Sequence, residues 1–186
     1  MSKVATRYSL AQATEWARSA ETLVGIHAPL VAVAGSIRRR RDDVGDVDLV
    51  VLDDTAQNPW QRSAINRDLA GVLGYEQTKD GDKIASFTHP TRCPLDLYYA
   101  TDDTWGITLL VRTGSAGHNM FLVEHGRKQL PARRLTVSRG IVDTAGNVVA
   151  SRTEEECFAA LGLAFVPPWE RKSPEYDAMV RADETP

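Results

Sequence analysis

The chain alternates between segments with helical and segments with strand-like hydrophobic spacing. Near the N-terminus, apolar residues recur every three or four positions and predict an amphipathic helix over residues 9–24. Ser9 and Gln12 have the spacing of a capping box at its start, and Gly25 and Pro29 mark its end. Further helices are predicted over residues 59–73, 105–112 and 154–161.

Short runs rich in β-branched residues predict strands between these helices. The first is a run of small apolar residues at 31–34, which turns at Gly35-Ser36, and the second is the buried run at 49–52. Asp80-Gly81 is a hairpin signal between residues 75–78 and 83–88. Other strands are predicted at residues 93–99 and, as a hairpin around 143–147, at residues 135–142 and 148–149.

Two acidic residues, Asp46 and Asp48, enter the second strand. Because side chains alternate across a strand, both carboxylates point from one face while Val47 and Leu49 point from the other. Two carboxylates on one face repel each other unless a cation lies between them, and hard oxygen ligands suit magnesium. The pattern also fits a strand that begins in solvent with both residues hydrated, so this spacing alone leaves the two interpretations open.

The composition is typical of a globular protein, and the net charge limits how the protein could bind nucleic acid. At 186 residues the chain is long enough for one domain or two small lobes, with 42% hydrophobic and 25% charged residues. The net charge of −3 excludes nucleic-acid binding through overall charge. Such binding would need local basic patches, for which the candidates are Arg38–Arg41, Arg127-Lys128 and Arg133-Arg134.

Cysteine and histidine usage indicates neither disulfides nor zinc. Cys93 and Cys157 are far apart and lack metal-ligand spacing, which favours reduced thiols inside the cell. The four histidines form no ligand pattern either. We find no transmembrane stretch or signal pattern, and expect a cytoplasmic or nucleoid-associated protein without a membrane partner.

The segment from Val31 to Leu52 carries a more specific signal than its parts. Gly35-Ser36, Arg39 and Gly45-Asp46-Val47-Asp48, at this spacing, resemble the nucleotidyltransferase signature of the family X DNA polymerases, the DNA polymerase beta group. The resemblance implies that Gly35, Ser36, Arg39 and Gly45 bind the nucleotide triphosphate and that Asp46 and Asp48 bind two metal ions. Backbone N–H groups at a glycine turn and nearby arginines are chemically suited to phosphate.

The same resemblance extends to a third carboxylate, Asp96, on the predicted strand at residues 93–99. It implies an α+β fold: a polymerase beta-like nucleotidyltransferase palm with a mixed sheet and helices, plus a small α/β C-terminal lobe. We therefore predict a reduced family member, without lyase and helix-hairpin-helix domains. Its expected parts are a palm at 1–102, a nucleotide- and template-binding lobe at 103–175 and a flexible tail at 176–186.

Residues of the predicted second lobe continue the resemblance. Thr113-Gly114-Ser115 followed by His118-Asn119 resembles the nucleotide-facing helix pair of family X polymerases, and implies that Thr113, Gly114 and Asn119 contact the sugar and base. The same residues would cap two consecutive helices whatever the function. Val111-Arg112 stands where many family members carry two aromatic residues. This replacement would affect discrimination between sugars but not the metal site.

These observations predict a minimal DNA-directed DNA polymerase, a monomer that fills gaps during DNA repair. Asp46, Asp48 and Asp96 are the expected catalytic and metal-binding residues, with two Mg²⁺ ions, or Mn²⁺, as cofactors. The primer 3′-hydroxyl would attack a deoxynucleoside triphosphate and release pyrophosphate, with Asp96 as proton acceptor. Gapped or primer–template DNA would be held through its phosphates by Arg127, Lys128, Arg133 and Arg134.

Two other functions are compatible with the sequence. The first is a template-independent nucleotidyltransferase of the same fold, which would tail nucleic acid or modify RNA or another acceptor. The second is a non-catalytic module that binds DNA ends. The presence of all three aspartates argues against this alternative.

Overall fold

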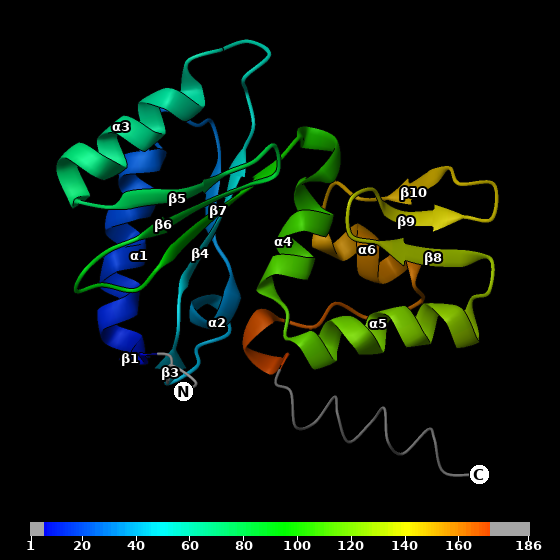
Figure 1. The fold of residues 1–186 in the computed structure, drawn as a ribbon. Coiled ribbons are helices and arrows are strands. Elements are labelled where there is room, and N and C mark those ends of the chain that lie inside the picture. Colours follow the sequence, from blue (N-terminus) through cyan, green and yellow to red (C-terminus); the bar gives the residue numbers. More distant parts are fainter. Residues whose placement is uncertain (1–5, 172–186) are drawn as a thin grey trace. The chain divides into compact units, whose positions relative to one another are not determined.

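The computed structural model describes residues 6–171, and the chain divides into two compact units between Thr101 and Asp102. Figure 1 shows a sheet with helices in the N-terminal unit and a smaller mixed unit after it. Each unit has its own hydrophobic core. The predicted tail at 176–186 lies outside the described residues.

The N-terminal unit is built on a mixed five-stranded sheet in the order β2-β4-β7-β6-β5. The central strands β4 and β7 run parallel, and the other neighbours are antiparallel. This confirms the predicted mixed sheet. The strands are β2 (Val31–Val33), β4 (Val47–Leu52), β5 (Glu76–Asp80), β6 (Ile84–Thr88) and β7 (Leu95–Ala100).

Two helices, α1 (Leu10–Val24) and α3 (Gln61–Leu73), pack on one face of this sheet. The predicted capping box is confirmed, because Ser9 Oγ accepts from the Gln12 N–H and the Gln12 side chain accepts from the Ser9 N–H. Alanines line the buried side of α1, which lets the helix lie close to the strands. The core under these helices includes Ala13, Ala17, Ala20, Val47, Leu49, Val51, Ile65, Leu69, Leu95 and Leu97.

Three short elements of this unit were not predicted. The turn expected at Gly35-Ser36 is the start of a four-residue helix, α2 (Gly35–Arg38). Two-residue strands, β1 (Tyr8–Ser9) and β3 (Asp43–Val44), pair antiparallel with each other. Such short elements are fixed by tertiary contacts, since they are too short for a periodic sequence pattern.

In its described part, up to residue 171, the C-terminal unit combines three helices with a small antiparallel sheet in the order β10-β9-β8. Its core includes Ile107, Leu110, Leu122, Ile141 and Phe158. The elements are a 3₁₀ turn at Asp102–Thr104, α4 (Trp105–Thr113), α5 (Ala116–Gln129), β8 (Arg133–Thr136), β9 (Gly140–Asp143), β10 (Val148–Ala150), α6 (Glu154–Ala160) and a 3₁₀ turn at Pro168–Glu170.

One strand prediction in this unit is wrong. The segment expected to form a single strand at 135–142 is divided into β8 and β9 by a turn at residues 137–139. The helix predicted at 154–161 is confirmed as α6, and Thr153 Oγ accepts from the Glu156 N–H at its start.

A buried ion pair ties the end of the described chain to α6. Arg171 is 0% exposed, and its Nη1 donates to Glu154 Oε1 over 2.7 Å. Its Nε donates to the Val166 carbonyl, and its guanidinium lies near the rings of Phe158 and Phe165.

Within residues 6–171, no helix is long and apolar enough to cross a lipid bilayer.

Candidate active site

Two of the predicted aspartates face each other on the central strands of the N-terminal sheet. Asp48 of β4 and Asp96 of β7 are direct partners in the parallel register. Their neighbours Leu49 and Leu97 are fully buried in the core, so both carboxylates project from the opposite face of the sheet. The parallel pairing therefore brings together two acidic residues that are far apart in sequence.

The third aspartate, Asp46, lies directly before β4 and joins this group electrostatically. Burial, followed by the charges of Asp46 and Asp96, raises the pKa of Asp48 to about 7. Loss of hydration and the charge of Asp96 raise the pKa of Asp46, while Arg7 and Arg39 oppose the rise. The structure thus places Asp46, Asp48 and Asp96 close enough for their charges to interact.

A tyrosine that the sequence analysis did not select lies between two of these carboxylates. Tyr98 follows Asp96 by two positions on β7, so its side chain emerges on the same face. Its hydroxyl donates to Asp96 Oδ2 over 3.2 Å. It also acts on the Asp48 carboxylate, where it counteracts part of the increase in the pKa of Asp48.

The predicted phosphate-binding turn packs directly against Asp48. Gly35 has a positive φ of 58°, and a Cβ atom there would overlap the Asp48 carboxylate. The next residue, Ser36, has a buried Oγ with no hydrogen-bond partner in the described part of the chain. A buried polar atom of this kind is costly unless a ligand or water satisfies it, so this side chain has capacity for a ligand.

Two arginines supply positive charge beside the acidic group. Arg39, at the end of α2, lowers the pKa of both Asp46 and Asp48. Arg7 was not predicted; it lies 3.9 Å from Asp43 and close to Gly45, where a Cβ atom would be 2.9 Å from Arg7 Nη1. Pairing of β1 with β3 brings Arg7 to this position, and no sequence pattern signals that pairing.

The nucleotide-binding residues predicted in the C-terminal unit lie at the end of α4, in the connection after it and in the first turn of α5. Thr113 is fully buried at the end of α4, and Gly114 has a positive φ of 68°. Asn119 Nδ2 donates to the Val111 carbonyl over 2.9 Å. Its Oδ1 is buried without a hydrogen-bond partner among residues 6–171, which leaves an acceptor for a ligand.

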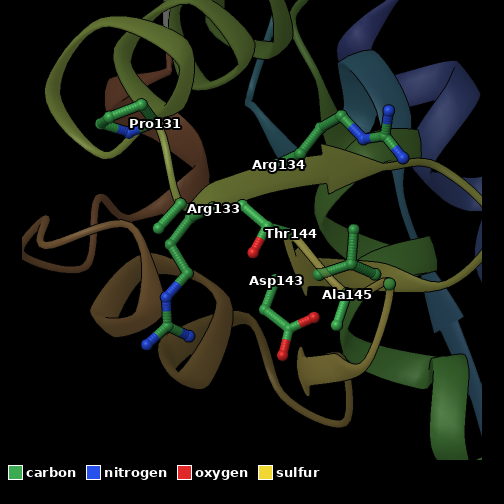
Figure 2. Close-up of a pocket in the computed structure, with 9 residues that line it drawn as sticks. Pro131, Arg133, Arg134, Asp143, Thr144 and Ala145 are labelled. Atoms are coloured by element: carbon green, nitrogen blue, oxygen red, sulfur yellow. The ribbon is translucent and has the colours of Figure 1, made fainter.

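The four predicted DNA-binding residues occupy two different settings in the C-terminal unit. Arg127 and Lys128 lie in the last turn of α5, where Glu124 Oε2 is 2.8 Å from Arg127 Nη2 and 4.0 Å from Lys128 Nζ. Arg133 and Arg134 lie on β8 and extend in opposite directions, as Figure 2 shows. Both residues are among those that line a cavity of about 340 Å³ beside the turn at residues 143–146.

The acidic group has the donor chemistry of a site for a divalent metal ion. Within residues 6–171, no three His, Cys, Asp or Glu side chains are arranged as a ready metal site. The donor chemistry nevertheless suits a hard divalent cation, because Asp46, Asp48 and Asp96 offer only carboxylate oxygens. Burial, followed by repulsion between the carboxylates, raises the pKa values of Asp46 and Asp48, and a cation would relieve the repulsion.

Comparison with known proteins gives two matches. Residues 108–172 match the family model described as DNA polymerase beta thumb. Over 142 residues, or 75% of this chain, the sequence is 29% identical to the DNA polymerase/3′-5′ exonuclease PolX of Bacillus subtilis (strain 168). The chain spans 24% of the length of that relative.

The mixed sheet with its opposed aspartates, followed by a unit that matches the thumb model, defines a protein with a polymerase beta-like fold. The two matches support the predicted resemblance of this chain to family X DNA polymerases.

Proposed function

We propose that this protein is a DNA-directed DNA polymerase that adds deoxynucleotides to a primer 3′-hydroxyl, in gap-filling repair. One observation carries the proposal: Asp48 and Asp96 are register partners on adjacent strands, and Asp46 interacts electrostatically with both. Three carboxylates from two neighbouring strands are the ligand set that two-metal phosphoryl transfer needs.

In this proposal the three aspartates have separate roles. Asp46 and Asp48 would hold the ion that accompanies the nucleotide, and all three carboxylates would hold a second ion. Bound Mg²⁺ or Mn²⁺ would acidify the primer hydroxyl and offset the charge of the reacting phosphates. Asp96 accepts the proton of that hydroxyl as the oxygen attacks the α-phosphate and pyrophosphate leaves.

The residues around Asp48 would bind the triphosphate. Ser36 Oγ can donate to a phosphate oxygen, because the chain gives this hydroxyl no other described partner. The backbone N–H groups of Gly35 and Gly45 would add hydrogen-bond donors for the phosphate oxygens. Arg39 adds a cation that already acts on the neighbouring carboxylates.

Residues of the C-terminal unit would bind the nucleoside and the DNA. Thr113 and Gly114 would shape the sugar site, and the Oδ1 of Asn119 is available to accept a hydrogen bond from the sugar or base. Arg127, Lys128, Arg133 and Arg134 would contact phosphates of gapped or primer–template DNA. This assignment rests on their charge and on the thumb match that covers all four.

Single-nucleotide insertion on a gapped duplex tests the proposal. We expect Asp48→Asn and Asp96→Asn each to lower the insertion rate by more than about 100-fold. Asp82→Asn, which changes an exposed carboxylate before β6, is the matched control and should insert nucleotides at the wild-type rate. Wild-type insertion by the Asp48→Asn protein would refute the proposal.

The template requirement is tested with the same wild-type protein. We expect insertion of the complementary nucleotide on the gapped duplex and little extension of a single strand. Equal extension of both substrates, regardless of the template base, would instead support a template-independent nucleotidyltransferase.

A further inference from the structure

We infer that Tyr98 is a positioning residue that holds Asp48 and Asp96 in the arrangement needed to bind divalent cations. The inference rests on the proposed function, because it concerns the same acidic group. Tyr98 is distinct from the residues assigned so far, since its hydroxyl offers a hydrogen bond rather than a metal ligand or a charge.

Strand register gives Tyr98 access to both carboxylates. Asp48 lies opposite Asp96, and Val50 lies opposite Tyr98, one step further along the same face. The Tyr98 hydroxyl donates to Asp96 Oδ2 over 3.2 Å, and it lies close enough to the Asp48 carboxylate to lower the pKa of that group. The hydroxyl group is therefore positioned to interact with both acidic residues across the strands.

The tyrosine is well suited to fix their orientation. Its side chain is buried, with 9% of the residue exposed, and it stands on a central strand rather than on a loop. A ring held in this way has little rotational freedom to lose when it supports a ligand group. Ligating carboxylates generally need such hydrogen-bond partners, and loss of one typically costs 10–100-fold in metal affinity.

The hydrogen bonds are compatible with cation binding. A carboxylate has two oxygens with about four lone-pair positions, so a bond to Asp96 Oδ2 leaves the other oxygen for a cation. The neutral hydroxyl also places a donor between two charges that otherwise repel each other. We therefore expect Tyr98 to support the bound state and not to compete with the metal.

The neighbouring Tyr99 provides a matched control. It lies next to Tyr98 on β7 but faces the opposite side of the sheet, where Arg62 stacks on its ring at 4.0 Å. Its hydroxyl is buried and has no hydrogen-bond partner among the described residues. Tyr99→Phe therefore removes the same kind of group from the same strand as Tyr98→Phe, but on the face away from the acidic group.

The test is titration of the full chain with Mn²⁺, read from the paramagnetic resonance signal of free Mn²⁺, without DNA or nucleotide. We expect Tyr98→Phe to bind Mn²⁺ about 10-fold more weakly than wild type, and Tyr99→Phe to bind it equally well. Insertion by Tyr98→Phe should need a correspondingly higher Mg²⁺ concentration and should recover at saturating Mg²⁺. The melting temperature in EDTA should stay near that of wild type, which a merely structural role would not predict.

Three results would overturn the inference. Equal Mn²⁺ affinity of wild type and Tyr98→Phe, with wild-type insertion intact, would refute the role of Tyr98 alone. Tighter binding by Tyr98→Phe would show that the hydroxyl competes with the cation. Failure of the wild-type protein both to bind Mn²⁺ and to insert nucleotides would refute the proposed function together with this inference.

Discussion

At the residue scale, the acidic group is a source of instability in the metal-free protein. Asp48 is affected most, because burial and two neighbouring carboxylates all disfavour its charged form. Gly35 packs against the same carboxylate, so Asp48 cannot move toward α2 to escape the repulsion. A cation-binding site destabilises the metal-free protein in this way, because its like charges are held together for a cation to bind.

The pH dependence of stability follows from the raised pKa of Asp48. In the unfolded chain this group loses its proton near pH 3.8, whereas in the folded chain it does so near pH 7. Its stabilising contribution is present below pH 3.8 and is lost as the pH rises to about 7. We expect Asp48→Asn to raise the free energy of unfolding at pH 8 by about 2 kcal/mol, with little effect near pH 4.

Urea denaturation in EDTA at pH 4.5 and pH 8 measures this effect. Asp82→Asn again serves as the control, and it should change stability by less than about 0.5 kcal/mol at either pH. A metal-free Asp48→Asn protein that is less stable than wild type at pH 8 would contradict the prediction.

The acidic residues could be predicted from sequence, but part of their environment could not. Asp46 and Asp48 are visible because they alternate with apolar residues on one strand, and Asp96 stands in a similar context. Tyr98 and Arg7 had no comparable signal. Their roles depend on the pairing of β4 with β7 and of β1 with β3, which brings together residues that are distant in sequence.

At the element scale, α3 contains one glycine in its interior and is ended by another, and the two have different structural roles. Gly71 lies within the exposed side of the helix, and a Cβ atom there would meet nothing within 4 Å. Gly74 ends the helix with a positive φ of 74°, a conformation that costs other residues about 1–2 kcal/mol. The same substitution should therefore have opposite effects at these two positions.

We expect Gly71→Ala to stabilise the protein by about 0.5–1 kcal/mol and Gly74→Ala to destabilise it by about 1 kcal/mol or more. The cost at Gly74 comes from its backbone conformation, because His89 Nε2 would lie at an ordinary contact distance of 3.4 Å from the new Cβ atom. Thermal denaturation of both variants at one pH provides the measurement. A shift of both melting temperatures in the same direction would contradict this account.

Long elements with clear end signals were predictable, whereas short ones and interrupted strands were not. The Ser9 capping box and Gly74 define the start of α1 and the end of α3. The turn between β8 and β9 was missed because Val137, which is 52% exposed, continued the apolar pattern of residues 135–142. A single exposed apolar residue is common on protein surfaces and carries no local signal of a turn.

At the scale of the whole molecule, DNA binding has to overcome a net charge of −3. The proposed DNA-binding residues differ in how much charge they can offer. Arg127 is already paired with Glu124, whereas Arg134 is an exposed residue on β8. The salt dependence of binding can separate these contributions, because each phosphate contact releases about one counterion.

We expect Arg134→Gln to reduce the slope of log affinity against log salt concentration by about one, and Arg127→Gln to reduce it less. Fluorescence anisotropy with a labelled gapped duplex over a range of KCl concentrations measures both slopes. Slopes that equal that of the wild type in both variants would exclude these residues from phosphate contact.

The buried pair of Arg171 and Glu154 has a practical consequence for shortening the protein. A truncation before residue 171 would leave the Glu154 carboxylate enclosed without its counter-charge, at a cost of about 3–5 kcal/mol. Engineered fusions and minimal versions should therefore retain this arginine, although it lies far along the chain from the proposed chemistry.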